Sequence, residues 1–138
     1  VTGSAMNCAW RTELTPLLWQ LPVFEGRYRR FGDIWSGLLA KRVLDHCGLA
    51  VLVNGEATVT HRRASDAAKN FLLEEPGRAP NEDLWAHLEQ YVLLRDPSDI
   101  IGSYREVTDH MAAYFFEHDQ AWAHHFVRAR DAWLDIFA

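Results

Sequence analysis

Apolar residues recur at helical spacing through the C-terminal third of the chain. They follow one another at intervals of three and four residues from Ile100, and a second such series starts at Trp122. This spacing places side chains on one face of an α-helix. The two stripes are Ile100, Tyr104, Val107, Met111, Tyr114 and His118, and Trp122, Phe126, Ala129, Trp133 and Ile136. They predict two long helices, packed as an antiparallel pair or presented to a second subunit.

Capping and breaking residues predict two helices in the first half. One covers residues 10–20 and stops before Pro22, because proline is unfavourable inside a helix. The other covers residues 34–47, with Asp33 as its N-cap and Gly48 just beyond its C-terminus.

Similar signals predict the helices of the second half. Ser65 caps a helix that ends at Pro76-Gly77, and Asn81 caps the next one. Residues 96–99, Asp-Pro-Ser-Asp, combine an N-cap, a proline at the first helical position and an acid, so a further helix starts there.

Residues 50–60 alternate between apolar and polar side chains on either side of Asn54-Gly55. Asn-Gly favours the type I′ turn, in which both central residues have positive φ. The turn pairs Leu52 with Ala57 and Ala50 with Val59, which places all four side chains on one face. The sequence therefore predicts a β-hairpin.

The composition excludes several classes. The chain has 138 residues, 49% of them hydrophobic and 24% charged, which excludes disordered and collagen-like chains and suits one domain. Residues 1–64 carry a net charge of +3 and residues 65–138 carry −8. A negative second half opposes binding to nucleic acid, whereas the first half does not.

The order of helix, basic segment, helix, hairpin and capped helix resembles a winged helix-turn-helix. The segment VLDHCGLAVLVNGEATVTHRRASDAAKNFL (residues 43–72) is similar to the third helix, wing and following helix of that superfamily. Ala68, Phe71-Leu72 and Pro76 follow in the order found in the N-terminal dimerisation domain of small-molecule O-methyltransferases. PadR-like and MarR-like regulators share the same arrangement.

The predicted fold is therefore mainly α with one β-hairpin, a winged-helix-type domain followed by dimerising or packing helices. It is expected to form a single domain over residues 1–138, with a tail (1–9), a winged-helix-like part (10–75) and C-terminal helices (80–138). The resemblance implies a non-catalytic association module, without the catalytic domain of a methyltransferase, because the chain has no GxGxxG loop. The alternative is a DNA-binding, PadR-like transcriptional regulator.

Two groups of site residues follow from these hypotheses. The dimerisation module predicts a homodimer or a separate protein partner, bound through C-terminal aromatic residues. The regulator predicts phosphate contacts from basic residues beside the wing and along the third helix. The first group is Trp122, Phe126, Trp133 and Phe137, and the second is Arg27, Arg29, Arg30, Lys41, Arg42, Arg62 and Arg63.

Two further patterns are weaker. Arg105 and His110 have the R-x4-H spacing of HEPN-type ribonucleases, a remote alternative, because side chains five residues apart diverge on a helix. Glu106 with His110, and Asp83 with His87, are spaced i, i+4 and could share a metal ion. Solvated acidic faces explain these pairs better, and the sequence predicts no metal, no cofactor and no catalytic residue.

Cys8 and Cys47 form no CxxC motif, and no apolar run reaches the length of a membrane span. No signal peptide is evident at the N-terminus. The expected location is the cytoplasm, with both cysteines reduced.

Overall fold

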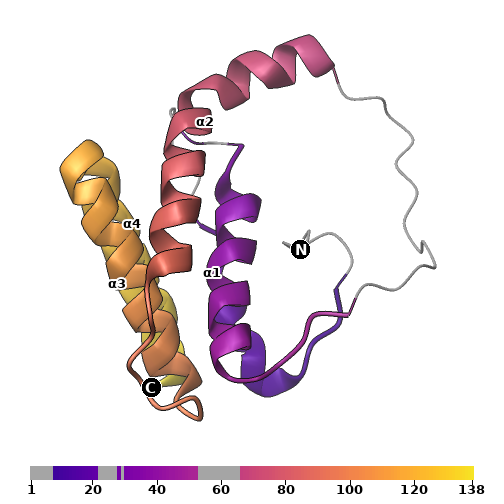
Figure 1. Cartoon of the computed structure of the whole chain (residues 1–138), viewed down its shortest axis with the longest axis vertical. Coiled ribbons are helices and arrows are strands. Elements are labelled where there is room, and N and C mark those ends of the chain that lie inside the picture. The colour runs from indigo at the N-terminus through magenta and orange to yellow at the C-terminus, as the bar shows by residue number, and fades with distance from the viewer. Residues whose placement is uncertain (1–7, 22–27, 29, 53–65) are drawn as a thin grey trace.

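The computed structural model describes residues 8–21, 28, 30–52 and 66–138, and these form helices and connecting segments. Within them α3 and α4 lie side by side, with α1 and the C-terminal half of α2 beside them (Figure 1). The elements are η1 (Thr12–Leu18), α1 (Gly32–His46), α2 (Ala67–Gln90), α3 (Ile100–His118), α4 (Gln120–Leu134) and η2 (Asp135–Phe137). None of the helices in the described part is long and apolar enough to cross a membrane.

The antiparallel pair of α3 and α4 is confirmed. On α3, Tyr104, Val107 and Met111 are fully buried, as the stripe predicts. Asp119 connects the two helices, because its N–H donates to the carbonyl of Phe115 and its side chain accepts a bond of 3.1 Å from the N–H of Trp122. One residue thus ends α3 and caps α4, which forces the chain to reverse.

The predicted end of α1 is confirmed, and its beginning is shifted. Gly48 has a φ of +67°, and the N–H of Leu49 donates to the carbonyl of Leu44 at 2.8 Å, as at a glycine-terminated helix. The helix begins at Gly32, so Asp33 lies in its first turn, where its side chain accepts from the N–H of Ile34.

The prediction that a helix ends at Pro76-Gly77 is wrong, because α2 continues through both Pro76 and Pro80. Its N-terminal half runs in a different direction from the C-terminal half (Figure 1). A bend relieves the clash of each proline ring with the preceding turn. Gly77 is buried at this point, and the ring of Phe31 packs directly against its backbone.

Asn81 is therefore not the cap of a new helix, and α2 crosses the predicted border at residues 75–80. The side-chain oxygen of Asn81 instead accepts a bond of 3.1 Å from the indole N–H of Trp35. At its N-terminus α2 is capped by Asp66, which accepts from the N–H of Lys69 at 3.0 Å, while the predicted cap Ser65 lies outside the described residues.

The winged-helix fold with its β-hairpin is wrong. No strand occurs in the described residues, and residues 50–52, the expected start of the hairpin, are irregular. Leu52 is 91% exposed and Val51 is 39% exposed, so the first strand has no buried face to stabilise it. Asn54-Gly55 and the remainder of the predicted hairpin lie outside the described residues.

The N-terminal helix is shorter and tighter than predicted. Residues 12–18 form a 3-10 helix that contains Pro16, which has no N–H to continue an α-helical ladder. The carbonyl of Pro16 accepts a hydrogen bond of 2.8 Å from the indole N–H of Trp133. This contact joins η1 to the end of α4, and Leu17, next to Pro16 in the chain, is buried.

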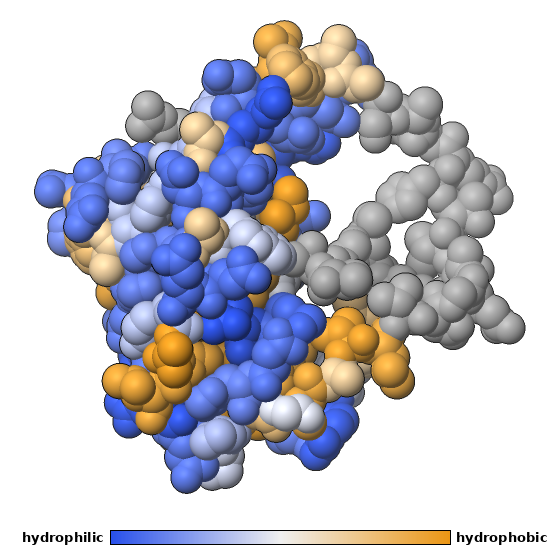
Figure 2. Space-filling view, viewed as in Figure 1, coloured by the Kyte–Doolittle hydropathy of each residue, from blue (hydrophilic) through white to orange (hydrophobic). Residues whose placement is uncertain are grey.

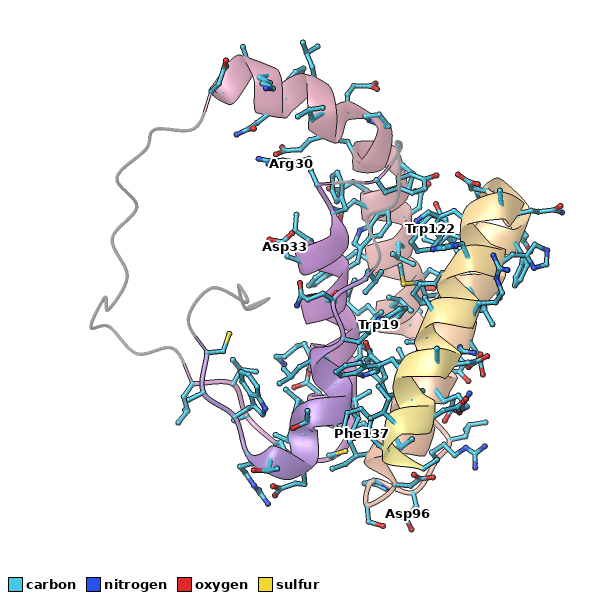
Figure 3. All side chains as sticks on the ribbon, turned by 180° about the vertical axis from the view of Figure 1, so that it is seen from behind. Trp19, Arg30, Asp33, Asp96, Trp122 and Phe137 are labelled. Carbon is cyan, nitrogen blue, oxygen red and sulfur yellow. The ribbon has the colours of Figure 1, made fainter. Side chains whose placement is uncertain are left out.

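An aromatic cluster forms the centre of the structure. Trp35 lies with its ring centroid 5.3 Å from Phe115 and 5.8 Å from Trp122, and Tyr28 packs against all three rings. Phe126 extends the cluster toward Trp19, with centroids 5.4 Å apart. Figure 3 shows Trp19 and Trp122 between α1 and α4. Stacked and edge-on contacts of this kind add to the burial of large apolar surfaces.

Candidate functional site

An open groove of about 610 Å³ lies between the segment that follows α2 and one face of α3. Its size lies within the usual range of small-molecule sites, but it is shallow. It is lined by Tyr91, Leu94, Arg95, Gly102, Arg105, Glu106, Asp109, His110 and Ala113. The groove therefore combines two aromatic rings with two guanidinium groups and two carboxylates.

Glu106 shapes the wall of the groove. One carboxylate oxygen accepts from the Tyr91 hydroxyl at 2.8 Å and from the N–H of Leu94 at 2.9 Å, and the other accepts from the N–H of Arg95 at 3.0 Å. Burial alone would raise the pKa of Glu106, but these hydrogen bonds hold that pKa below its usual value. The hydrogen bond to Glu106 raises the pKa of the Tyr91 hydroxyl. Glu106 is thus an anchor for the segment between α2 and α3.

The same segment is also held from α1. One Nη of Arg42 donates to the Tyr91 carbonyl at 2.7 Å, and a ring nitrogen of His46 lies 2.8 Å from the Arg95 carbonyl. These bonds satisfy carbonyls that follow the last turn of α2. Together with Glu106, these bonds hold the backbone at Arg95 in place, while Arg95 itself is exposed.

A stack of rings crosses from α2 to α3 beside the groove. His110 of α3 lies between Tyr91 and His87, with centroid distances of 3.8 Å and 4.1 Å and nearly parallel planes. Tyr114 continues the series beyond His87 at 5.7 Å. Desolvation lowers the pKa of His110, and the neighbouring His87 lowers it further. The Nε2 atom of His87 is buried and has no hydrogen-bond partner within the described part of the chain.

A charged cluster closes the other side of the groove. Arg130 of α4 is only 3% exposed, and it pairs with Asp109 and with Asp131, the latter at 2.9 Å. Its Nη1 also donates to the Thr108 hydroxyl at 3.2 Å. Arg105 reaches Asp131 at 2.6 Å. The two arginines are therefore neutralised by two aspartates, and Arg95 is the remaining cation of the groove, whose charge helps to lower the pKa of Glu106.

The basic residues predicted to contact phosphates do not form one surface in the described part. Arg30 lies 3.7 Å from Glu74 of α2, Lys41 pairs with Asp45 on the same helix, and Arg42 is engaged by the Tyr91 carbonyl. Figure 3 shows Arg30 near the start of α1. The other four predicted residues, Arg27, Arg29, Arg62 and Arg63, lie outside the described residues.

The aromatic residues predicted to form an interface pack within the chain. Phe126 has no exposed surface, and Trp122 stacks on it with centroids 5.0 Å apart. Trp133 is half-buried, donates to Pro16 and packs edge-on against Phe137 at 5.1 Å. Association with a second copy or another protein stays a prediction. Exposed hydrophobic side chains lie elsewhere, for example Phe71 and Leu72 in the N-terminal half of α2, where Figure 2 shows hydrophobic surface.

The other spaced pairs have separate roles. Arg105 and His110 both line the groove, but Arg105 is paired with Asp131 while His110 lies in the ring stack. Glu106 is occupied by three donors, and Asp83 interacts with the Tyr114 hydroxyl. No group of three or more metal-ligating side chains occurs among the residues that the structure describes.

Sequence reasoning missed Tyr91 and Arg95 as groove residues. Tyr91 is the C-cap residue of α2. The signal that was available is Glu106, a carboxylate on the polar flank of the α3 stripe. Its partners could not be found from spacing, because they lie 11 to 15 residues away.

Comparison with known proteins identifies the class to which this helical chain belongs. The family model for reversibly glycosylated polypeptides matches residues 1–138, so the chain belongs to the reversibly glycosylated polypeptide family. Among curated proteins it is similar to the probable UDP-arabinopyranose mutase 4 of Arabidopsis thaliana, with 29% identity over 106 residues. The aligned part is 75% of this chain and 29% of the plant protein. No solved structure matches the chain.

The family match corrects the functions predicted from the sequence. The chain is not a methyltransferase-like dimerisation module, and it is not a PadR-like or MarR-like regulator. The family match also replaces the remote alternative of a HEPN-type ribonuclease. The resemblance depended on the order of helices around Asn54-Gly55, and this order does not distinguish a winged helix from other helical arrangements.

Proposed function

We propose that this chain is the helical part of a protein that acts on a UDP-linked sugar, and that its α2–α3 groove contacts the nucleotide portion. The observation that carries the proposal is the family match over the whole chain, supported by the plant relative named for UDP-arabinopyranose. Because the chain spans about 29% of that relative, we assign to it a contribution to binding rather than the complete reaction.

The chemistry of the groove suits such a ligand. A UDP-sugar carries a planar base and a diphosphate, which are bound in proteins by aromatic rings and by guanidinium groups. Tyr91 supplies a ring at the wall, with one face packed on His110, and Arg95 supplies an exposed guanidinium. Asp109 is ion-paired with Arg130, whereas Glu106 keeps its negative charge because its three donors are uncharged, so we expect the diphosphate at the Arg95 guanidinium and away from Glu106.

The proposal is tested by titrating the chain with UDP and with UDP-arabinopyranose, by calorimetry and by NMR shift mapping. Arg95→Gln is expected to weaken binding about tenfold, since a charge-assisted hydrogen bond is lost. Arg128→Gln is the matched control, because Arg128 is an exposed arginine of α4 outside the groove. Shifts that map elsewhere, or equal affinities for the two variants, would contradict the groove assignment. The absence of any binding would contradict the role in sugar-nucleotide recognition.

The predicted cytoplasmic location and association with a second copy or protein partner are kept as parts of the proposal. The low cysteine content supports the first, because the chain has two cysteines in 138 residues and they form no CxxC motif. The exposed apolar residues Phe71 and Leu72 support the second.

A further inference from the structure

The contact between α2 and α3 depends on a small number of side chains. In the C-terminal half of α2, Leu84 and Leu88 are fully buried. His87 of α2 and Tyr91, the C-cap residue of α2, stack on the two faces of His110 of α3. The imidazoles of His87 and His110 face each other with centroids 4.1 Å apart and an angle of 7° between their planes. Two uncharged rings pack well in this arrangement, whereas two imidazolium ions would repel each other strongly.

The neighbouring acidic groups are already engaged. On α2, Asp83 interacts with the Tyr114 hydroxyl of α3. On α3, Glu106 accepts three hydrogen bonds, and Asp109 pairs with Arg130 of α4. Among the described residues, these three carboxylates are therefore bound to groups other than the two imidazoles.

Positive charges lie on the remaining sides. Arg42 of α1 binds the Tyr91 carbonyl, and Arg95 and Arg105 line the same groove as His110. Arg105 is paired with Asp131, so Arg95 is the unneutralised cation of the groove that His110 also lines.

We propose that the stacked imidazoles of His87 and His110 form an acid-sensitive clasp, which holds the C-terminal half of α2 against α3 near neutral pH and releases it in mild acid. The direction follows from the groups around the stack. His110 has a lowered pKa in the folded chain, so the unfolded or opened chain binds the proton more tightly. Stability is therefore lost as the pH falls below the ordinary value of 6.5. The groove loses the wall formed by Tyr91 when α2 is released. This property of the fold does not depend on the ligand of the groove.

The test is hydrogen exchange of the unliganded chain at pH 7.5 and pH 5.5, corrected for the intrinsic effect of pH on exchange. We expect protection in residues 84–90 to fall at least tenfold relative to α4 in acid, and the melting temperature to fall by about 3 °C or more. Ordinary carboxylates titrate below this interval, so they contribute little to the difference. Equal retention of protection by α2 and α4 at pH 5.5 would overturn the proposal without any variant.

Ring variants separate the imidazole charge from the packing. His110→Phe keeps a ring in the stack but cannot take a proton, and it should abolish the selective loss of protection in α2. His124→Phe is the control, because His124 is exposed on α4 and packs only edge-on against Phe116. If His110→Phe does not fold, His87→Phe serves the same purpose. Persistence of the acid effect in a folded ring variant would contradict the clasp.

Discussion

Gly77 offers the sharpest test of how α2 continues past two prolines. In an ordinary helix, replacing glycine by alanine stabilises the fold by about 1 kcal/mol. At Gly77, however, an added Cβ would lie 2.3 Å from Cδ2 and 2.4 Å from Cε2 of Phe31. Carbon atoms in contact are normally about 3.5–4.0 Å apart, so the ring would have to move by more than about 1 Å.

Phe31 has little room for this movement. Its side chain is 5% exposed, and the ring of Trp35 lies with its centroid 5.4 Å away. Overpacking of a core costs about 1–3 kcal/mol, which exceeds the gain in helix propensity. We therefore expect Gly77→Ala to reduce the free energy of unfolding by about 1–2 kcal/mol and the melting temperature by about 3–8 °C.

Urea unfolding followed by circular dichroism measures this effect. Ala79→Gly is the reference for propensity alone, because Ala79 is exposed on the same helix. Phe31→Ala removes the obstructing ring, so adding Gly77→Ala in that background should be neutral or stabilising. If Gly77→Ala stabilises the chain that keeps Phe31 as much as it stabilises the Phe31→Ala chain, the packing of Phe31 against α2 is refuted.

Two other predictions concern single side chains. Phe126→Ala should lower the free energy of unfolding in urea by about 3–5 kcal/mol, because the Phe126 ring has no exposed surface. Ile136→Ala is the control: Ile136 is 68% exposed, so the loss should be less than about 0.5 kcal/mol, and equal losses for the two variants would contradict the assigned core. Glu106→Gln should cost about 1–2 kcal/mol at pH 7, because the half-buried carboxylate accepts three hydrogen bonds. Since the pKa of Glu106 is lowered in the folded chain, the stability that Glu106 contributes is present above the ordinary pKa of a carboxylate and is lost as the pH falls through the lowered pKa. If the free energy of unfolding has the same pH dependence in the native and Glu106→Gln chains, this reasoning is contradicted.

The sequence by itself determined the features that depend on neighbours along the chain. The stripe from Ile100 to Tyr114 predicted the buried face of α3, since residues three and four apart share a helix face. Gly48 predicted the end of α1, because a positive φ there favours glycine. The predominantly helical class follows from the same local signals.

Tertiary structure decided the features that depend on distant residues. Pro76 and Pro80 are local signals for the end of a helix, but α2 continues through both, with the Phe31 ring packed against Gly77. The alternation around Asn54-Gly55 predicted a strand at residues 50–52, where Leu52 has no buried face. A hairpin is stabilised by what packs on it, and spacing within the segment cannot supply that information.

The groove shows the same division. Glu106 was recognisable as a polar residue beside an apolar stripe, but its partners Tyr91, Leu94 and Arg95 belong to the segment that leads from α2 into α3. The aromatic residues from Trp122 onward were predicted to contact a partner, and the structure places Phe126 inside its own chain, stacked on Trp122. A stripe specifies which face of a helix is buried, whereas the arrangement of the other helices determines what covers that face.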